Sequence, residues 1–348
     1  MKILIVKLSA FGDIIHALPA LGDLLIRPEV AEVHWLVDAR YAFVTETFPA
    51  QVRVHTVALR GNSPVASCWQ ALRQLRRIDF DAIIDLQGLL KSAVLARGAG
   101  HPVFGIDKEH LREKASRYLM QPVCFHPDEK HVVQQYRRVA AAPFSTGSIL
   151  SGKPESALPY IPPRIDIAQT TLAADTNLLA RLELTDKKFV ILHSAGGWET
   201  KFLPEQTWIT IANDLMQTGK TPVFSWGNAA EKILAQRLTA ACNGFALPER
   251  LNMSALCTLL SSACAVVGAD TGLLHLAAAL NTPTITFWGP SASWRSAPLN
   301  DAADPQGERN WQIESNPSCG PCFKRRCNQF VCMHAIAPES ITRILHEL

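Results

Sequence analysis

Short, continuous apolar runs recur along the chain, and they restrict its fold more than any other feature of the sequence. In the first half these runs are Lys2–Val6, Val33–Val37, Val52–Val57 and Asp81–Leu86. Such a run is typical of a strand buried on both faces of a parallel sheet. Segments with helical spacing separate the runs, over Ile14–Ile26 and from about Leu90 to Ala96. Strands that alternate with helices predict an α/β fold.

The pattern is interrupted between Pro143 and Arg164, where frequent proline, glycine and serine indicate a linker. Strand-like runs restart at Lys188–His193 and Pro222–Trp226 and recur around Val266 and Ile285, with helical segments near Trp208–Thr218, Ala230–Cys242 and Ser254–Ser262. We therefore expect an N-terminal domain over residues 1–160, a C-terminal domain over 161–335 and a final helix within 336–348. Ligands of such sheets bind in a cleft at the carboxyl ends of the strands.

Composition limits the classes of function. A length of 348 residues suits two domains, and a formal net charge of +3 gives no indication of nucleic-acid binding. Basic residues cluster at Arg73, Arg76 and Arg77, at Arg137 and Arg138, and at Lys324–Arg326, where solvated helix faces are a simpler interpretation than binding patches. No apolar stretch reaches the roughly 20 residues of a membrane helix. The nine cysteines, an odd number, suit a reducing compartment, so we expect a cytoplasmic protein.

Glycine motifs narrow the function further. Neither half carries Gly-x-Gly-x-x-Gly after its first strand, and no Walker loop is present, which argues against a nicotinamide dehydrogenase and a P-loop enzyme. Instead, Asp270-Thr271-Gly272 follows the apolar run Ala263–Val267 and stands where a helix is predicted to begin. A helix N-terminus offers free N–H groups and partial positive charge to an anion, such as the diphosphate of a nucleotide sugar.

Three blocks of the sequence resemble glycosyltransferase family 9, the ADP-heptose transferases of lipopolysaccharide core assembly. They are Val6–Ala20, Asp85–Ala93 and Gly268–Ala279, and the resemblance extends over nearly the whole chain. The first two blocks are most similar to the members that add the first heptose to the Kdo of Kdo2-lipid A.

The resemblance implies a GT-B fold, in which two Rossmann-like domains face each other across a cleft and the C-terminal domain holds most of the donor. It implies an inverting transfer from ADP-heptose that needs no cofactor for catalysis, by a peripheral protein at the cytoplasmic face of the inner membrane. Kdo2-lipid A is the expected acceptor, and a protein or another core sugar is the alternative.

Asp13 is the expected general base, because an inverting transfer needs a group that takes the proton of the attacking acceptor hydroxyl. It follows the first predicted strand and the Gly12 turn, and the resemblance aligns it with the catalytic aspartate of the family. The alternative is that Asp13 only caps the helix that follows.

The donor diphosphate is expected at the Asp270 turn, where developing negative charge must be stabilised. Backbone donors at Thr271 and Gly272 suit this purpose, and the resemblance adds contacts from Asp270, His275 and Lys201. The alternatives are a capped helix with His275 packed on one face, and a solvated Lys201.

The loop His193–Gly197 supplies two glycines, Gly196 and Gly197, whose backbone can approach a phosphate closely. Family members carry threonines near this place, so backbone N–H groups are expected here instead of hydroxyls. The resemblance assigns Glu231 to the adenosine ribose, with an exposed helix residue as the alternative, and places Leu251 in the donor site.

The resemblance places Arg60 and Arg112 near the acceptor, and arginine forks suit its carboxylates and phosphates. Gly61, Asn62, Ser63 and Pro64 follow Arg60, where family members carry further basic residues. This difference keeps another acceptor open.

Four cysteines, Cys319, Cys322, Cys327 and Cys332, form the pattern C-x2-C-x4-C-x4-C. Thiols this close can surround one tetrahedral zinc or iron ion, and a similar cluster binds iron in related protein heptosyltransferases. We expect a structural metal, with four reduced, unliganded cysteines as the alternative. The cluster also motivates a non-catalytic, metal-binding scaffold as a competing class of function.

Overall fold

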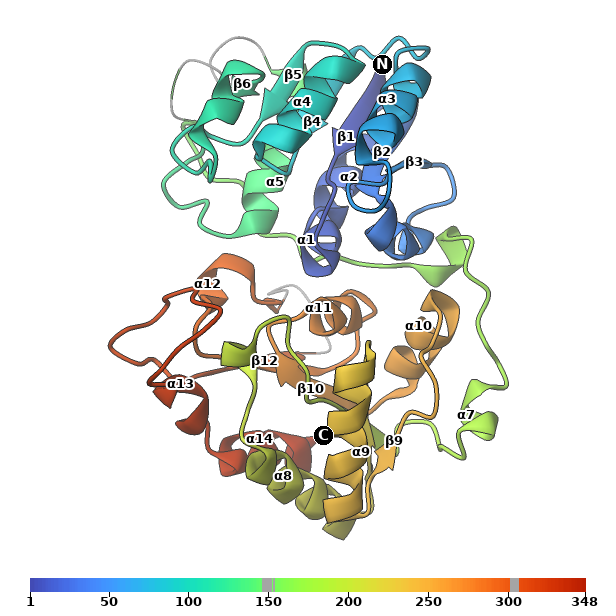
Figure 1. Cartoon of the computed structure of the whole chain (residues 1–348), viewed down its shortest axis with the longest axis vertical. Helices are drawn as coiled ribbons and strands as arrows, with labels where there is room; N and C mark the ends of the chain where they lie inside the picture. The colour runs from blue at the N-terminus through green and yellow to red at the C-terminus, as the bar shows by residue number, and fades with distance from the viewer. Residues whose placement is uncertain (146–151, 153, 301–306) are drawn as a thin grey trace. The chain divides into compact units, whose positions relative to one another are not determined.

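The computed structural model describes residues 1–145, 152, 154–300 and 307–348. It divides into two compact units, unit 1 over Met1–Thr171 and unit 2 over Leu172–Leu348, drawn from blue to green and from green to red in Figure 1. Residues 146–151 and 153 of the expected linker lie outside the described residues. Between residues 154 and 166 the backbone has no helix or strand.

Unit 1 is built on a six-stranded parallel sheet in the order β3-β2-β1-β4-β5-β6. The strands are β1 (Lys2–Val6), β2 (Glu32–Asp38), β3 (Arg53–Val57), β4 (Ala82–Asp85), β5 (Val103–Gly105) and β6 (Gln121–Pro122). The central strand β1 pairs on both sides, with Ile3 opposite Val33 of β2 and Ala82 of β4. Residues Ile3–Val6 have no exposed surface, as expected for an apolar run buried on both faces.

Helices α3 and α4 of unit 1 pack against each other, as do α2 and α5. The helices of this unit are α1 (Phe11–His16), α2 (Leu18–Leu25), α3 (Pro64–Leu75), α4 (Leu90–Ala99) and α5 (Val132–Ala141), with 3-10 turns η1 (Ala39–Thr47), η2 (Lys114–Tyr118), η3 (Ala142–Phe144) and η4 (Ile167–Gln169).

The prediction of one continuous helix over Ile14–Ile26 is wrong. Helix α1 begins earlier, at Phe11, and ends at His16, and α2 starts afresh at Leu18. Pro19 explains the break, because its ring nitrogen has no hydrogen to donate within a continuing helix, whereas the first turn of a new helix tolerates it.

Unit 2 repeats this architecture with the sheet order β12-β11-β10-β7-β8-β9. Its strands are β7 (Phe189–His193), β8 (Thr221–Phe224), β9 (Phe245–Ala246), β10 (Ala265–Ala269), β11 (Thr284–Trp288) and β12 (Asn310–Glu314). Counted within each unit, both sheets have the order 3-2-1-4-5-6 of the Rossmann fold. The predicted α/β class with two Rossmann-like domains is confirmed.

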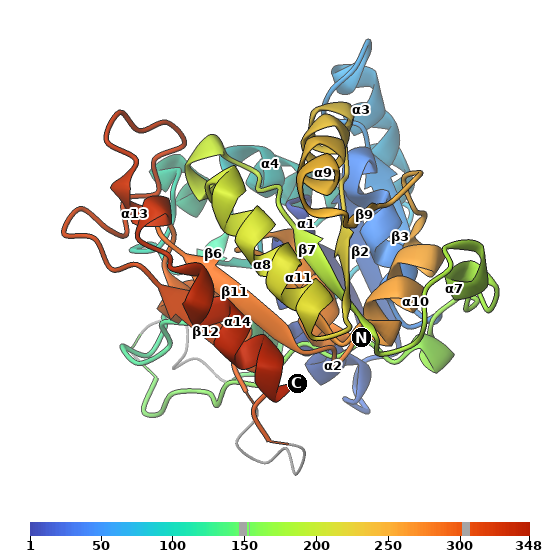
Figure 2. The ribbon, with the colours of Figure 1, turned by 90° about the horizontal axis from the view of Figure 1, so that it is seen from below.

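Helix α8 of unit 2 packs against α9 and against the final helix α14, and Figures 1 and 2 show α14 beside α8. The helices are α7 (Leu178–Arg181), α8 (Glu205–Gln217), α9 (Ala229–Cys242), α10 (Met253–Ser262), α11 (Gly272–Ala279), α12 (Ser293–Ser296), α13 (Val331–His334) and α14 (Pro338–Glu347), with one 3-10 turn, η5 (Glu199–Lys201). Within the described residues, none of the helices has the length and apolar character needed to span a membrane.

Arg137 and Arg138 differ from the expected solvated face, since only 9% and 7% of their surfaces are exposed. Arg137 Nε lies 2.6 Å from Asp23 Oδ2, and Arg138 Nη2 lies 2.5 Å from Glu129 Oε1. Such pairing is needed to bury two adjacent guanidinium groups. These arginines therefore stabilise unit 1 from within.

Candidate functional site

Three of the sequence-predicted residues, Asp13, Lys201 and Asp270, lie where the strand order of their sheet reverses. In unit 1 this point lies between β1 and β4, and in unit 2 between β7 and β10. At this point the loops that follow the two neighbouring strands run in opposite directions. Ligands of open α/β sheets bind there, at the carboxyl ends of the strands. Asp13 follows β1, whereas Lys201 follows β7 and Asp270 follows β10.

Asp13 lies in the first turn of α1, where its Oδ2 accepts a hydrogen bond from the Ala10 N–H at 3.1 Å. The carboxylate therefore does cap this helix. The cap engages one oxygen, so capping and a role as base are compatible. The side chain is partly exposed at the carboxyl edge of the sheet.

A buried polar network lies directly behind Asp13. The Nζ of Lys7 donates to Tyr136 Oη at 2.7 Å and to the Leu86 carbonyl oxygen at 3.0 Å, and only 2% of Lys7 is exposed. Burial alone would lower the pKa of Lys7, but Tyr136, Asp13 and Asp85 together raise it. Lys7 thus provides a persistent positive charge near Asp13.

Asp85, at the end of β4, is fully buried. Burial raises its pKa to about 6, although hydrogen bonds from Gln87, Ser92 and Gly88 and the charge of Lys7 act in the opposite direction. Its Oδ1 accepts from the Gln87 N–H at 2.8 Å, so the carboxyl group fixes the turn that presents the Gln87 side chain.

Gln87 connects this turn to the loop that precedes α1, the helix that carries Asp13. Its Oε1 accepts hydrogen bonds from the backbone N–H groups of Leu8 and Ser9, both at 3.0 Å. Sequence reasoning assigned no role to Lys7, Asp85 or Gln87, although all three lie in the blocks that carried the family resemblance. The family resemblance of these blocks was the sequence signal that could have identified the three residues.

Arg60 and Arg112 are both exposed in the segments that follow β3 and β5. The parallel sheet places these segments at the same edge as Asp13. Both arginines therefore lie at the sheet edge that carries Asp13, and their role toward an acceptor stays a prediction.

In unit 2, Lys201, Asp270 and His275 form one ion-paired group. Lys201 Nζ lies 2.7 Å from Asp270 Oδ2, and His275 Nε2 lies 3.0 Å from Asp270 Oδ1. Lys201 is 7% exposed and His275 is 4% exposed, so the alternative of a solvated Lys201 is wrong. Burial alone would raise the pKa of Asp270, but the His275 hydrogen bond and the Lys201 charge hold it well below its usual range.

Helix α11 begins immediately after Asp270, with Thr271 as its N-cap and Gly272 as its first residue. The Thr271 hydroxyl oxygen is buried without a hydrogen-bond partner among the residues that the structure describes. Gly268 allows the close packing beneath this turn, since a Cβ there would lie 2.7 Å from Leu274 Cδ2. The helix start, the orphaned hydroxyl and the neighbouring Lys201 together suit an anion.

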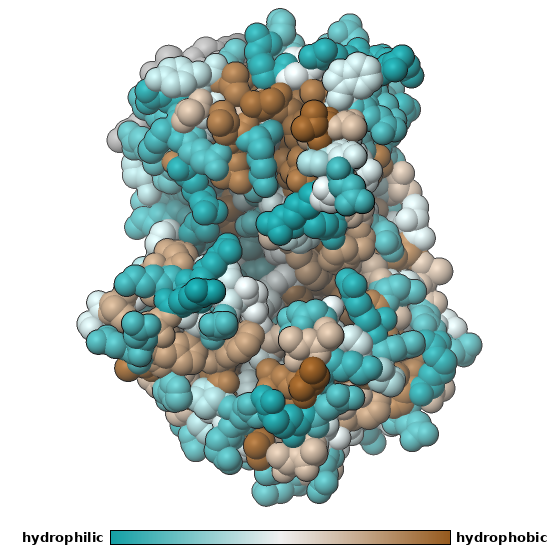
Figure 3. Space-filling model, in the orientation of Figure 1, coloured by the Kyte–Doolittle hydropathy of each residue, from teal (hydrophilic) through white to brown (hydrophobic). Residues whose placement is uncertain are grey.

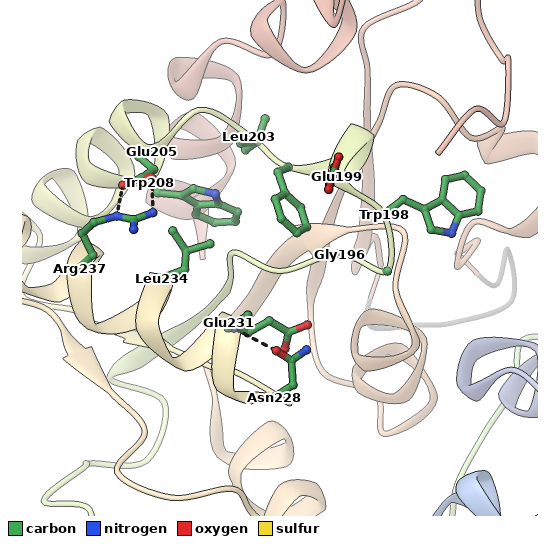
Figure 4. A pocket seen from close by; sticks show the side chains of 13 residues that line it. Gly196, Trp198, Glu199, Leu203, Glu205, Trp208, Asn228, Glu231, Leu234 and Arg237 are labelled. Carbon is green, nitrogen blue, oxygen red and sulfur yellow. Dashed lines mark hydrogen bonds and ion pairs between the residues drawn. The ribbon is translucent and has the colours of Figure 1, made fainter. Parts of the chain in front are cut away.

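A cavity of about 540 Å³ in unit 2 is lined by Gly196, Gly197 and Glu231. Figure 4 shows Glu231 and Asn228 at one side of this cavity, Gly196 at another, and Trp208 with Leu234 deeper between the helices. Gly196 also permits the loop to pass close to Lys201, because a Cβ there would lie 3.0 Å from Lys201 Cβ.

Glu231 belongs to the N-terminal cap of α9. Its Oε2 accepts from the Gly227 N–H at 2.7 Å, and its own N–H donates to Asn228 Oδ1 at 3.1 Å. Leu251 is partly buried in the segment before α10 and is not part of the cavity wall. The structure thus brings Gly196, Gly197 and Glu231 together and leaves Leu251 outside this group.

His193, at the end of β7, is a polar residue that the sequence did not single out. Its Nδ1 lies 2.9 Å from Ser225 Oγ at the end of β8. Burial lowers its pKa to about 4, so the imidazole is neutral near pH 7.

The structure does not confirm the metal site expected at the four clustered cysteines. Within the described ranges, no group of three or more His, Cys, Asp or Glu side chains is placed to hold a metal ion. Cys319 and Cys322 are close enough to Cys332 to raise its pKa, after burial as the main cause. The Cys327 thiol accepts from the Phe330 N–H at 3.3 Å.

Comparison with known proteins decides the family. A family model described as glycosyltransferase family 9 (heptosyltransferase) matches residues 68–331. The chain belongs to this family. It is therefore a glycosyltransferase, as the three sequence blocks predicted, and this membership sets aside the dehydrogenase interpretation.

Relatives of this family 9 chain cover most of its length. Lipopolysaccharide heptosyltransferase 1 of Pseudomonas aeruginosa is 33% identical, over 94% of this chain and 87% of that protein. The protein of the same name from Escherichia coli is 30% identical, over 84% of this chain and 88% of that protein. The solved structure of E. coli heptosyltransferase WaaC with ADP-2-deoxy-2-fluoro heptose has a TM-score of 0.73 at 26% identity, covering 100% of this chain and 99% of that one.

Proposed function

We propose that this family 9 glycosyltransferase moves a heptosyl group from ADP-heptose to the Kdo of Kdo2-lipid A in the lipopolysaccharide inner core. The observation that carries the proposal is the buried Lys201–Asp270–His275 group beside the start of α11. It offers a cation and backbone N–H groups to a diphosphate, and relatives that share this fold are lipopolysaccharide heptosyltransferases.

In the proposed reaction, a hydroxyl of Kdo attacks the anomeric carbon of the heptose. Asp13 takes the hydroxyl proton, a glycosidic C–O bond forms, and the bond from the anomeric carbon to the diphosphate oxygen breaks with inversion. Lys7, buried behind Asp13, keeps a positive charge near this carboxylate during the step. ADP leaves with the bonding electron pair.

The donor-side residues stabilise the leaving diphosphate. Lys201 supplies a positive charge, and the N–H groups at the start of α11 face the developing negative charge. Asp270 and His275 hold the Lys201 ammonium in position. The backbone of Gly196 and Gly197 approaches a phosphate, and Glu231 accepts from the ribose hydroxyls in exchange for its Gly227 cap.

On the acceptor side, Arg60 and Arg112 bind the carboxylates and phosphates of the lipid-linked sugar. Because that acceptor is anchored by acyl chains, the enzyme works as a peripheral protein on the cytoplasmic face of the inner membrane. The absence of further basic residues after Arg60 keeps another core sugar or a protein as the second candidate acceptor.

The zinc or iron site predicted at the cysteine cluster stays a structural proposal, separate from the transfer chemistry. Metal analysis of the purified protein tests it, and Cys322→Ser should then lower both metal content and melting temperature. Equal metal content in the variant and the parent chain would contradict the site.

The decisive experiment is incubation of the purified protein with ADP-heptose and Kdo2-lipid A, followed by mass spectrometry of the lipid. A gain of one heptose is the expected result. No gain from a folded protein would contradict the proposed donor and acceptor pair, and the same assay with other core acceptors would then test the second candidate.

A further inference from the structure

Helices α3 and α4 expose large apolar side chains on the surface of unit 1. Val65 is 81% exposed and Trp69 is 65% exposed on α3, and Leu90 is 42% and Val94 is 51% exposed on α4. The two residues of each pair are four positions apart, so they lie on one face of their helix. Figure 3 shows apolar side chains gathered over these helices in unit 1. We call this surface the α3–α4 face.

The two helices form a single rigid platform. Arg76 Nε donates to the Gly98 carbonyl oxygen at 2.6 Å. A Cβ at Gly98 would lie 3.0 Å from Leu72 Cδ2, so the helices pack closely at this crossing. The exposed side chains therefore belong to one continuous surface and not to two independent helices.

Basic residues outnumber acidic residues around these apolar side chains. Residues 47–78 contain five arginines and no acidic residue, and residues 86–106 contain Lys91 and Arg97 and no acidic residue. Glu113 is an acidic neighbour of this face, since its Oε2 accepts from the Leu90 N–H at the start of α4. Five of these basic residues are exposed on or next to the two helices and give the face a positive charge: Arg73, Arg76, Arg77, Lys91 and Arg97.

Trp69 and Arg73 combine both properties in one pair. The Arg73 guanidinium carbon lies 5.6 Å from the centroid of the Trp69 ring, and both side chains are exposed. An indole next to a cation suits the boundary between lipid headgroups and acyl chains, where tryptophan and basic residues are enriched. A second copy of the chain suits this face poorly, because symmetric pairing would oppose arginine with arginine.

We propose that the α3–α4 face docks this protein onto an anionic phospholipid bilayer. The apolar side chains enter the headgroup region, and the surrounding arginines and Lys91 bind lipid phosphates. This proposal extends the proposed function by naming the surface that contacts the membrane. The link between this surface and a lipid acceptor rests on the proposed function.

The position of the face relative to the site of unit 1 supports this assignment. Helices α3 and α4 begin after the carboxyl ends of β3 and β4, so Val65 and Leu90 lie at the edge that carries Asp13 and Gln87. A bilayer bound there lies next to the acceptor side of unit 1. An acceptor sugar can then reach this edge while its acyl chains stay in the membrane.

The test is co-sedimentation of the full chain with vesicles of phosphatidylcholine, with and without about 30% phosphatidylglycerol. We expect binding to the anionic vesicles only, falling as NaCl screens the charges. Trp69→Ser should weaken the partition coefficient about tenfold, and Arg73→Gln about fivefold. Trp294→Ser, which removes a 55% exposed indole from unit 2, is the matched control and should bind as the parent chain does.

Three results would overturn the proposal. The folded parent chain could fail to bind anionic vesicles, or the Trp69→Ser and Arg73→Gln variants could bind them as strongly as the parent chain does. The third result is binding of polyglutamate or of a second copy of the chain in place of vesicles. Transfer to a deacylated, water-soluble acceptor separates this proposal from the proposed function. That rate should be equal in the parent chain, Trp69→Ser and Arg73→Gln. If none of the three proteins transfers to the soluble acceptor while the parent chain still binds vesicles, the proposed reaction is contradicted and the proposed docking surface is not.

Discussion

The ammonium group of Lys201 lies 2.7 Å from Oδ2 of Asp270 and 2.6 Å from the backbone carbonyl oxygen of the same residue. These two contacts join η5, after β7, to the start of α11, after β10. Asp270 also accepts from His275, so its carboxylate positions a cation at the place where the sheet favours anion binding. Contacts among residues of unit 2 therefore hold the proposed donor site together.

Lys201→Met should weaken donor binding and lower the stability of unit 2. Loss of a charge-assisted contact to phosphate should raise the Kd for ADP about 10- to 100-fold. Asp270 would remain buried with one partner fewer, so the free energy of unfolding should fall by about 3 kcal/mol. Calorimetric titration with ADP and chemical unfolding measure the two effects. Lys188→Met, at an exposed lysine of the same unit, should change neither, and an unaltered ADP affinity in Lys201→Met would contradict the donor role.

Asp13→Asn should abolish transfer without preventing the helix cap. The asparagine oxygen still accepts from the Ala10 N–H, but the amide cannot take a proton, so kcat should fall by about 10²- to 10⁴-fold. Donor Kd and melting temperature should stay nearly constant. Asp79→Asn, at an exposed residue of unit 1, serves as the control. Turnover equal to that of the parent chain would remove Asp13 as the base.

Gln87 is predicted to act as a positioning residue for Asp13. Gln87→Met removes the acceptor for the Leu8 and Ser9 N–H groups, and we expect kcat to fall about tenfold, since each lost hydrogen bond is worth about 1 kcal/mol. Gln87→Glu keeps an acceptor oxygen at the same reach and should restore most of kcat. ADP affinity, which depends on unit 2, should not change. A loss of kcat that Gln87→Glu does not restore would disprove the positioning role.

The stability of unit 2 should fall as the solution is acidified below neutral pH. The pKa of His193 drops from 6.5 to about 4 on folding, so the unfolded chain binds a proton between these values and the folded chain does not. This contribution to stability is complete above pH 6.5 and is lost progressively toward pH 4.

Between pH 7 and pH 5 the loss from His193 amounts to about 2 kcal/mol. His193→Gln retains a polar partner for Ser225 and should flatten the pH dependence by that amount. Urea unfolding of both proteins at pH 7 and pH 5 provides the measurement. Parallel pH profiles in the two proteins would show that His193 does not titrate as stated.

Local sequence patterns were sufficient for the long buried strands but not for the short or edge strands. Continuous apolar runs marked β1, β7 and β10, because a strand covered on both faces excludes polar residues. By contrast, β6 and β9 have two residues each, and β12 carries Asn310, Gln312 and Glu314 at the edge of its sheet. Such strands exist because a neighbouring strand supplies their hydrogen bonds, which no local pattern reports.

The sequence by itself determined the α/β class, the family and the turn that carries Asp270, because these depend on local patterns of residues. The turn predicted at Gly12 is instead part of helix α1, whose first turn carries Asp13. Only the tertiary structure decided which side chains meet. It placed Tyr136 on Lys7 and Lys201 on Asp270 across long stretches of chain, and it buried Arg137 and Arg138 while leaving Trp69 exposed. Burial and ion pairing depend on non-local packing. A residue of one type can therefore be buried in an ion pair at one place in the fold and exposed on the surface at another.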